Sequence, residues 1–155
     1  MLGCVLALDQ ALRTTGYAVF NGQELIAYGT FEVDTKLPIE ERLHEFMLKV
    51  KQLKAEYSPD IVIFEDIQEQ HNIQTFKTLA YVQAAMLIFC ALTKTSYKIY
   101  SPSQWRKILG GCFGRKREEQ KAHAQELVKT KYGIDVDSDT ADAICIGSAY
   151  IEESQ

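Results

Sequence analysis

The chain has 155 residues, of which 46% are hydrophobic, so it is long enough for one compact domain and too short for two of ordinary size. The four cysteines are far apart, and no apolar run approaches roughly 18 residues, which argues against a zinc site, a disulfide framework, a secretory leader and a membrane span. We therefore expect residues 1–155 to form a single domain of a cytoplasmic protein with free thiols.

The net charge of −4 is unevenly distributed along the chain. The segment from Lys94 to Lys131 contains ten Lys and Arg residues against three Glu, so it carries a local charge of +7 within an acidic protein. Such a sector can bind a polyanion while acidic side chains elsewhere bind cations. The alternative is that these Lys and Arg side chains only solvate helices.

The first part of the chain predicts three strands. Residues 2–8 are almost continuously apolar, as in a strand buried on both faces, and this strand ends at Asp9. Residues 16–20 and 24–33 predict two further strands, joined by the tight turn Asn21-Gly22. Three consecutive strands with short connections indicate an antiparallel meander.

The middle of the chain predicts two helices around a short strand. Pro38 begins an amphipathic helix that ends near Tyr57. Residues 61–64 form an apolar run that ends at Glu65, which is typical of a buried central strand. Residues 74–93 predict a long helix that is apolar around much of its circumference.

The last part predicts one strand, over residues 97–100, and then helices only. A short helix begins before Trp105, a charged helix covers 115–132, and a last helix covers 138–150 with Ser138 as its N-cap. The resulting order predicts an α/β fold in which a central mixed five-stranded sheet, with the antiparallel meander plus parallel strands, is flanked by helices.

Four carboxylates lie at informative positions. Asp9 and Glu65 each end an apolar strand, so they emerge at one edge of the sheet if those strands are neighbours. Asp139 and Asp142 are three residues apart at the start of a predicted helix and share one of its faces. Individually, Asp139 can instead favour the helix dipole and Asp9 can cap a turn, whereas a buried Glu65 is costly without a partner.

Four acids held together repel one another and raise one another's pKa unless cations neutralise them. A ligand set made only of oxygen favours Mg²⁺, with Mn²⁺ as a substitute. We therefore predict two divalent ions at the four carboxylates. In such two-metal sites the ions lie about 3.5–4 Å apart and support the in-line hydrolysis of a phosphodiester.

Three motifs, in the correct order, resemble those of the RuvC family of Holliday-junction resolvases. The first motif is matched by LALDQALRTTGYAVF, which contains Asp9; the second by IVIFEDI, which contains Glu65. The last, a D-x-x-D-A pattern, is matched by DSDTADAICIG with Asp139 and Asp142. The resemblance covers nearly the whole chain. It implies an RNase H-like fold and a metal-dependent crossover junction endodeoxyribonuclease that uses these four carboxylates as catalytic metal ligands.

The resemblance also implies partners. It predicts a homodimer that cuts opposing strands of a four-way junction, with the apolar helix over 74–93 at the dimer interface; the alternative for that helix is the interior of one subunit. Arg106 and Lys121 fall where the family has basic residues that contact phosphate. The complete set that we expect to contact DNA is Arg13, Arg106, Lys107, Arg115, Lys116, Arg117 and Lys121.

Two positions depart from the family pattern. Gln10-Ala11 replaces a small Pro-Gly turn after the first aspartate, and Gln68 replaces an aromatic residue in the loop after the glutamate. These departures predict relaxed selectivity that extends to forks, and they favour a phage-encoded member that acts inside a bacterial cell. Trp105 either stacks on a base or anchors its helix to the core.

Three other functions remain open at this point. An RNA–DNA hybrid nuclease of the same fold would share the metal site but not the dimer. A non-catalytic DNA-binding module has no reason to place acids beside phosphate. An actin-like or sugar-kinase-type ATPase shares the strand, aspartate and hairpin opening, but it needs a second domain and a glycine-rich adenosine site.

Overall fold

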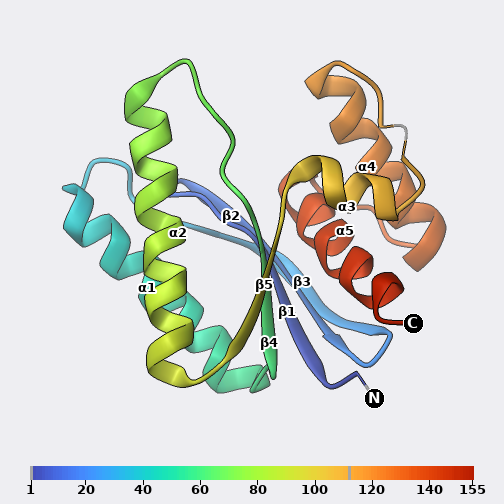
Figure 1. Cartoon of the computed structure of the whole chain (residues 1–155), viewed down its shortest axis with the longest axis horizontal. Helices are drawn as coiled ribbons and strands as arrows, with labels where there is room; N and C mark the ends of the chain where they lie inside the picture. The colour runs from blue at the N-terminus through green and yellow to red at the C-terminus, as the bar shows by residue number, and fades with distance from the viewer. Residues whose placement is uncertain (1, 112) are drawn as a thin grey trace.

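The computed structural model describes residues 2–111 and 113–155, and these residues fold into a mixed five-stranded sheet between two layers of helices (Figure 1). In their order across the sheet, the strands are β3 (Glu24–Glu32), β2 (Thr14–Asn21), β1 (Cys4–Asp9), β4 (Ile61–Glu65) and β5 (Ser96–Tyr100). The first three strands pair antiparallel, whereas β1, β4 and β5 are parallel. The predicted meander with added parallel strands is confirmed.

Helices cover both faces of the sheet (Figure 1). One face carries α1 (Ile39–Tyr57) and α2 (Ile73–Thr93). The other face carries α3 (Pro102–Ile108), α4 (Arg117–Tyr132) and α5 (Ser138–Glu153). Residues of β1 contribute alternately to the two cores that result. This double burial explains why the first strand is apolar at almost every position.

Side-chain caps set two helix starts that the sequence pattern missed. The N-cap of α5 is Asp137, whose side chain accepts a hydrogen bond from the backbone N–H of Thr140 at 2.8 Å. Ser138, the predicted cap, is instead the first residue of the helix. In α2, Asn72 is the cap and accepts from the backbone N–H of Gln74. Both side chains satisfy N–H groups that have no partner within the helix.

Two glycines let α5 lie directly on the sheet. A Cβ atom on Gly16 of β2 would overlap the carbonyl oxygen of Asp139, at the start of α5. A Cβ on Gly147, farther along α5, would overlap the ring of Phe20 on β2. Because both contacts exclude a side chain, the two glycines fix the distance between α5 and β2.

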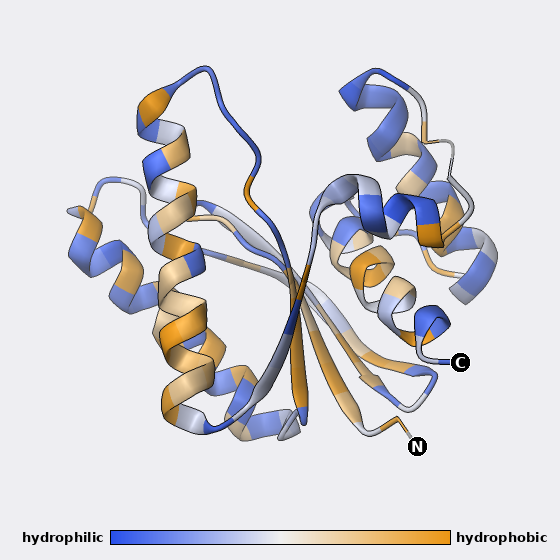
Figure 2. Ribbon diagram, viewed as in Figure 1, coloured by the Kyte–Doolittle hydropathy of each residue, from blue (hydrophilic) through white to orange (hydrophobic). Residues whose placement is uncertain are grey.

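The helix α2 is apolar on both its inner and outer sides. Within the part of the chain that the structure describes, it is the one helix long and apolar enough to cross a membrane by length and composition alone. Figure 2 shows its C-terminal part as hydrophobic. Its inner side supplies four residues to the core: Val82, Met86, Phe89 and Cys90. Its outer side leaves Ile88 59% and Leu92 80% exposed, so α2 covers the sheet and presents a second apolar face.

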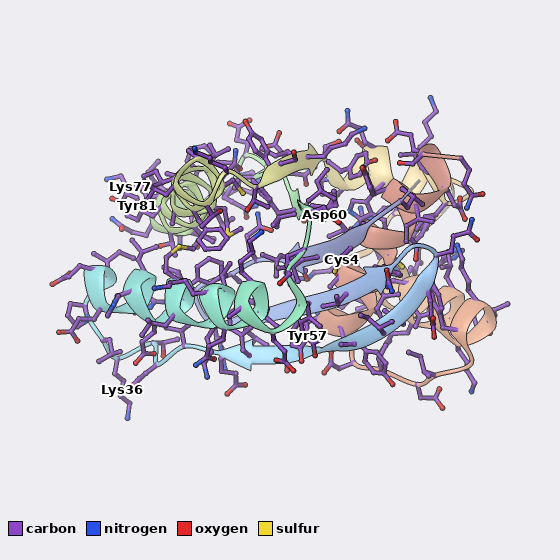
Figure 3. The ribbon with its side chains drawn as sticks, turned by 90° about the horizontal axis from the view of Figure 1, so that it is seen from below. Cys4, Lys36, Tyr57, Asp60, Lys77 and Tyr81 are labelled. Atoms are coloured by element: carbon purple, nitrogen blue, oxygen red, sulfur yellow. The ribbon has the colours of Figure 1, made fainter. Side chains whose placement is uncertain are left out.

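Polar contacts join the start of β1 to the residues just before β4, at the opposite end of these strands from Asp9 and Glu65. Figure 3 labels the residues that form them, Cys4, Tyr57 and Asp60. The backbone N–H of Cys4 donates to Oδ2 of Asp60 at 2.8 Å, and its thiol donates to the carbonyl of Tyr57. Cys4, Cys90 and Cys145 are free thiols, as predicted. Cys112, the fourth cysteine, lies outside the described residues.

Candidate active site

The carboxyl ends of β1 and β4 place two acids at one edge of the sheet. The two strands are parallel neighbours, with Leu8 opposite Phe64, and the next residues are Asp9 and Glu65. The convergence of Asp9 and Glu65 required that their strands be neighbours, and the structure shows that they are.

The first turn of α5 reaches the same edge. Gly16 is paired with Asp9 across β1 and β2, and the glycine allows the backbone of Asp139 to lie against the strand. Asp142 follows one turn later on the same helix face. All four predicted carboxylates line one cavity of about 380 Å³.

Gln10 fastens the two acid-bearing strands together at this edge. Its side-chain amide donates to the carbonyl oxygen of Glu65 and accepts from the backbone N–H of Glu65 at 3.2 Å. The side chain thus replaces the next backbone rung of the β1–β4 ladder. The turn that follows is closed by Thr15, whose hydroxyl bonds to both backbone groups of Ala11 at 2.9 and 3.1 Å. These contacts form the turn at Gln10-Ala11, where the family pattern has Pro-Gly.

Burial raises the pKa of each of the four acids, and the charges of neighbouring members of the cluster raise the pKa of Asp9 and of Asp142 further. For Asp9, burial raises the pKa well above its usual range, and the charges of Glu65 and Asp142 add to the effect. Burial and the charge of Glu65 raise the pKa of Asp142 to about 7. Burial also raises the pKa of Glu65 and of Asp139. A cluster of acids with raised pKa values is the electrostatic signature of a site that favours cations.

Trp105 contacts one of these acids directly. Its indole N–H donates to Oε2 of Glu65 at 2.8 Å, and this bond opposes the effect of burial on the pKa of Glu65. The indole is 1% exposed. Of the two alternatives for this residue, stacking on a base is therefore wrong, and anchoring in the core is confirmed. No pattern in the sequence indicated the hydrogen bond to Glu65.

Four of the predicted DNA contacts line the same cavity as the acids: Arg106, Arg115, Arg117 and Lys121. In the ranges 2–111 and 113–155, none of the four takes part in an ion pair within 4.0 Å. The Nε atom of Arg106 is buried without a hydrogen-bond partner. These cations therefore face the cavity with their charge available to an anion.

The other three predicted contacts lie elsewhere. Lys107 lines a separate cavity with Lys98 and Glu153. Arg13 is exposed in the turn after β1, and Lys116 is exposed just before α4. Neither of them lines the cavity of the four acids. Sequence position alone could not separate these residues from the four that face the acids.

The donor set of the cavity suits a hard divalent cation, because it consists of carboxylate oxygens and contains no His or Cys. Among the described residues, no three His, Cys, Asp or Glu side chains are already arranged so that they could hold a metal ion. The four acids thus share a cavity and repel one another without forming a closed ligand cage. The residues suit a divalent metal ion because their ligand atoms are carboxylate oxygens and because a cation would relieve the repulsion between them.

Comparisons with known proteins agree with this geometry. The family model described as crossover junction endodeoxyribonuclease RuvC matches residues 5–149. A protein of that name from Magnetococcus marinus is 25% identical over 157 residues, which cover 97% of this chain and 85% of the relative. Another, from Dictyoglomus thermophilum, is also 25% identical and covers 97% and 98% of the two chains.

Solved structures show the same fold. T. thermophilus RuvC in complex with a Holliday junction substrate has a TM-score of 0.79 at 16% identity, over 98% of this chain and 94% of that one. Fowlpox virus resolvase, in complex with its substrate Holliday junction DNA, has a TM-score of 0.66 at 17% identity, over 97% and 98%. These likenesses confirm the expected RNase H-like fold.

Proposed function

Since the chain belongs to the RuvC family of crossover junction endodeoxyribonucleases, we propose that it is a divalent-metal-dependent nuclease that resolves four-way DNA junctions by hydrolysing phosphodiester bonds. One observation carries the proposal. Four carboxylates from β1, β4 and α5 line the same cavity as four cations from α3, α4 and the loop before α4, and none of these cations forms an ion pair with another described residue. A phosphodiester held by metal ions at the acids has its remaining charge balanced by the cations.

The roles divide between the two kinds of side chain. Asp9, Glu65, Asp139 and Asp142 would hold Mg²⁺, or Mn²⁺ in its place, as two ions per site. When bound, these ions supply Lewis-acid activation of water and offset charge on the scissile phosphate. Arg106, Arg117 and Lys121 orient the DNA backbone, because guanidinium and ammonium groups bind phosphate oxygens without reading base sequence.

Two observations support four-way junctions as the substrate: the DNA bound to the solved resolvases, and an apolar surface that can form a homodimer. The two solved resolvases are complexes with Holliday junction DNA. A symmetric junction needs two cuts, and the exposed apolar side of α2 supports a homodimer that supplies two sites. Forks are included as further branched substrates, because Gln68 replaces the aromatic residue of the family pattern. We propose one domain over residues 1–155 that acts in the cytoplasm of a bacterial cell; a phage origin stays a prediction.

A cleavage assay tests the function. A synthetic four-way junction, a fork, a linear duplex and an RNA–DNA hybrid are each incubated with Mg²⁺, Mn²⁺ or a chelator. We expect cutting of the junction with either metal, slower cutting of the fork, and no cutting in the chelator. Cutting of the hybrid in preference to the junction would instead identify the hybrid nuclease of the same fold.

The variants Asp9→Asn and Glu65→Gln sharpen this assay. Both should abolish cutting and leave junction binding largely intact, because the lost charges are assigned to metal rather than to DNA. Asp60→Asn is the matched control, since Asp60 lies just before β4, at the other end from Glu65, and an Asn oxygen can still accept from Cys4. Full cutting by the Glu65→Gln protein at normal metal concentration would reject the role of Glu65.

A further inference from the structure

One buried indole connects the acids of the cavity to its cationic wall. Trp105 donates its N–H to Oε2 of Glu65 at 2.8 Å. The guanidinium carbon of Arg106 lies 5.0 Å from the centroid of the same indole ring. Trp105 is also the only tryptophan in the chain. The N–H edge of the indole therefore contacts Glu65, a candidate metal ligand, and the face of its ring contacts Arg106, a residue proposed to bind phosphate.

The surrounding structure holds the indole in this orientation. Glu65 pairs with Tyr100 on β5, and α3 begins directly after that strand. The start of α3 is fixed by a reciprocal pair of bonds between Ser101 and Gln104. Phe113 then packs edge-on against Trp105, with ring centroids 5.4 Å apart and an interplanar angle of 88°. With 1% of Trp105 exposed, the ring has little space to rotate.

The chemistry of an indole suits it to hold a ligand without competing for the metal. Its N–H is a donor only, so it cannot coordinate a cation. A single bond to one oxygen of Glu65 restricts the rotation of the carboxylate and leaves the other oxygen without this partner. Groups that hydrogen-bond to metal ligands orient them and tune the affinity of the site.

We propose that Trp105 is a positioning residue that holds the Glu65 carboxylate in the orientation needed to bind metal. The inference rests on the proposed function, because it assumes that Glu65 is a metal ligand. Loss of the indole N–H should therefore weaken metal binding before DNA is present. Loss of the aromatic ring as a whole would in addition disturb Arg106 and Phe113.

The test changes the N–H alone. Because the chain has a single tryptophan, growth of a tryptophan auxotroph on benzothienylalanine replaces only Trp105, and puts sulfur where the indole has N–H. Calorimetric titration with Mn²⁺, without DNA, measures the affinity of the parent, this analogue and Trp105→Phe. We expect roughly tenfold weaker binding in the analogue and at least as large a loss in Trp105→Phe. In single-turnover cleavage, excess Mn²⁺ should recover part of the lost rate.

Two controls separate positioning from packing. Phe46→Leu removes a buried aromatic group from the core on the other face of the sheet, away from α5, so it should lower the melting temperature and leave the Mn²⁺ affinity unchanged. The single indole N–H resonance in the NMR spectrum should differ between the parent and the Glu65→Gln variant. In the parent it should also shift when a diamagnetic divalent cation is added. If the role of Trp105 is purely structural, the analogue protein will melt at a lower temperature than the parent and will bind Mn²⁺ with the same affinity.

The outcomes are distinguishable from those of the function test. A parent that binds Mn²⁺ and cuts junctions, together with an analogue that binds Mn²⁺ equally well, would overturn the role of Trp105 and leave the function standing. A parent that binds no divalent cation would overturn both. An indole resonance that does not respond to Glu65→Gln would show that the hydrogen bond itself is absent.

Discussion

The four carboxylates of the cavity oppose folding and favour metal binding for the same reason. The fold buries them side by side, so their ionised forms are less stable in the folded protein than in the unfolded chain. A raised pKa means that the folded state binds more protons than the unfolded state between the two pKa values. Metal-free protein should therefore lose stability as the pH rises through this interval, which for Asp142 runs from about 4 to about 7.

This balance predicts opposite pH dependences with and without metal. In a chelator, the melting temperature of the parent should fall between pH 5 and pH 8, whereas the affinity for Mg²⁺ should rise, by up to about tenfold per pH unit for each proton that the metal displaces. Asp142→Asn removes a charge whose pKa is raised to about 7, so it should melt above the parent at pH 8 in chelator. Thermal melting and calorimetric Mg²⁺ titration measure both effects.

Asp142→Asn is also the internal check on this explanation. A variant that melts below the parent in chelator at pH 8 would show that repulsion at Asp142 does not oppose folding. A parent whose Mg²⁺ affinity is independent of pH between 5 and 8 would show that the acids are already ionised.

The sequence could predict the four acids but not the residues that hold them. Asp9, Glu65, Asp139 and Asp142 follow recognisable strand and helix patterns, so their convergence could be expected. Gln10 looked like a departure from a family turn, because its partner in the fold, the backbone of Glu65, is 55 residues away. Contacts between a side chain and a distant backbone leave no periodic signal in a sequence.

At the scale of elements, the position of α5 decides whether the site forms. Gly16 matched a family motif in the sequence, and the structure supplies the physical reason: its missing side chain lets α5 approach the strand that carries it. The helix itself was predicted over residues 138–150. Its cap was not, because Asp137 and Ser138 are both good capping residues and the backbone geometry selects Asp137.

The outer side of α2 predicts how two copies associate. Replacing Ile88 and Leu92 by Lys puts charge on its most exposed apolar positions near the C-terminal end, where a cation is compatible with the helix dipole. We expect Ile88→Lys with Leu92→Lys to weaken the dimer at least tenfold and to leave the fold intact, because neither residue is buried in the monomer. Sedimentation over a range of protein concentrations measures the dissociation constant.

Leu48→Lys is the comparison for this pair of substitutions. Leu48 lies on α1 and is also exposed, at 43%, but it is not part of α2. It should leave the dissociation constant unchanged. Equal weakening by Leu48→Lys, or a parent that is monomeric at micromolar concentration, would contradict a dimer through α2.

For the molecule as a whole, the alternation of strands and helices was sufficient to predict the sheet and the layers on it. The meander and the parallel strands could be predicted because short connections imply antiparallel pairing and because parallel strands need helical crossovers. The sequence left open whether β1 and β4 are neighbours, and the structure shows that they are. The distribution of cations on the surface was beyond this reasoning. Arg106 and Lys107 are adjacent in the chain, but only Arg106 lines the cavity, since successive residues of a helix point in different directions.

The separation of charge across the molecule predicts a steep salt dependence of DNA binding. Each phosphate contact contributes a slope of about 0.9 to the fall of log affinity with log salt concentration. Arg106→Ala with Lys121→Ala should therefore reduce the slope by about two for a four-way junction. Fluorescence anisotropy of a labelled junction in chelator, at several salt concentrations, gives this slope.

Two lysines on the other face of the sheet give the control. Lys49→Ala with Lys51→Ala removes the same charge from the exposed surface of α1 and should leave the slope near that of the parent. An unchanged slope in the Arg106 and Lys121 variant would mean that neither residue contacts phosphate.

The acids of the cavity come from three elements, namely β1, which is the first described strand, β4, and α5, which is the last described helix. During translation, Asp9 leaves the ribosome long before Asp142. The contact between Gly16 and the start of α5 cannot form until α5 has been made. A nascent or truncated chain that stops before α5 therefore lacks half of the acidic cluster. A site that needs all four acids should therefore become active only once synthesis has passed α5.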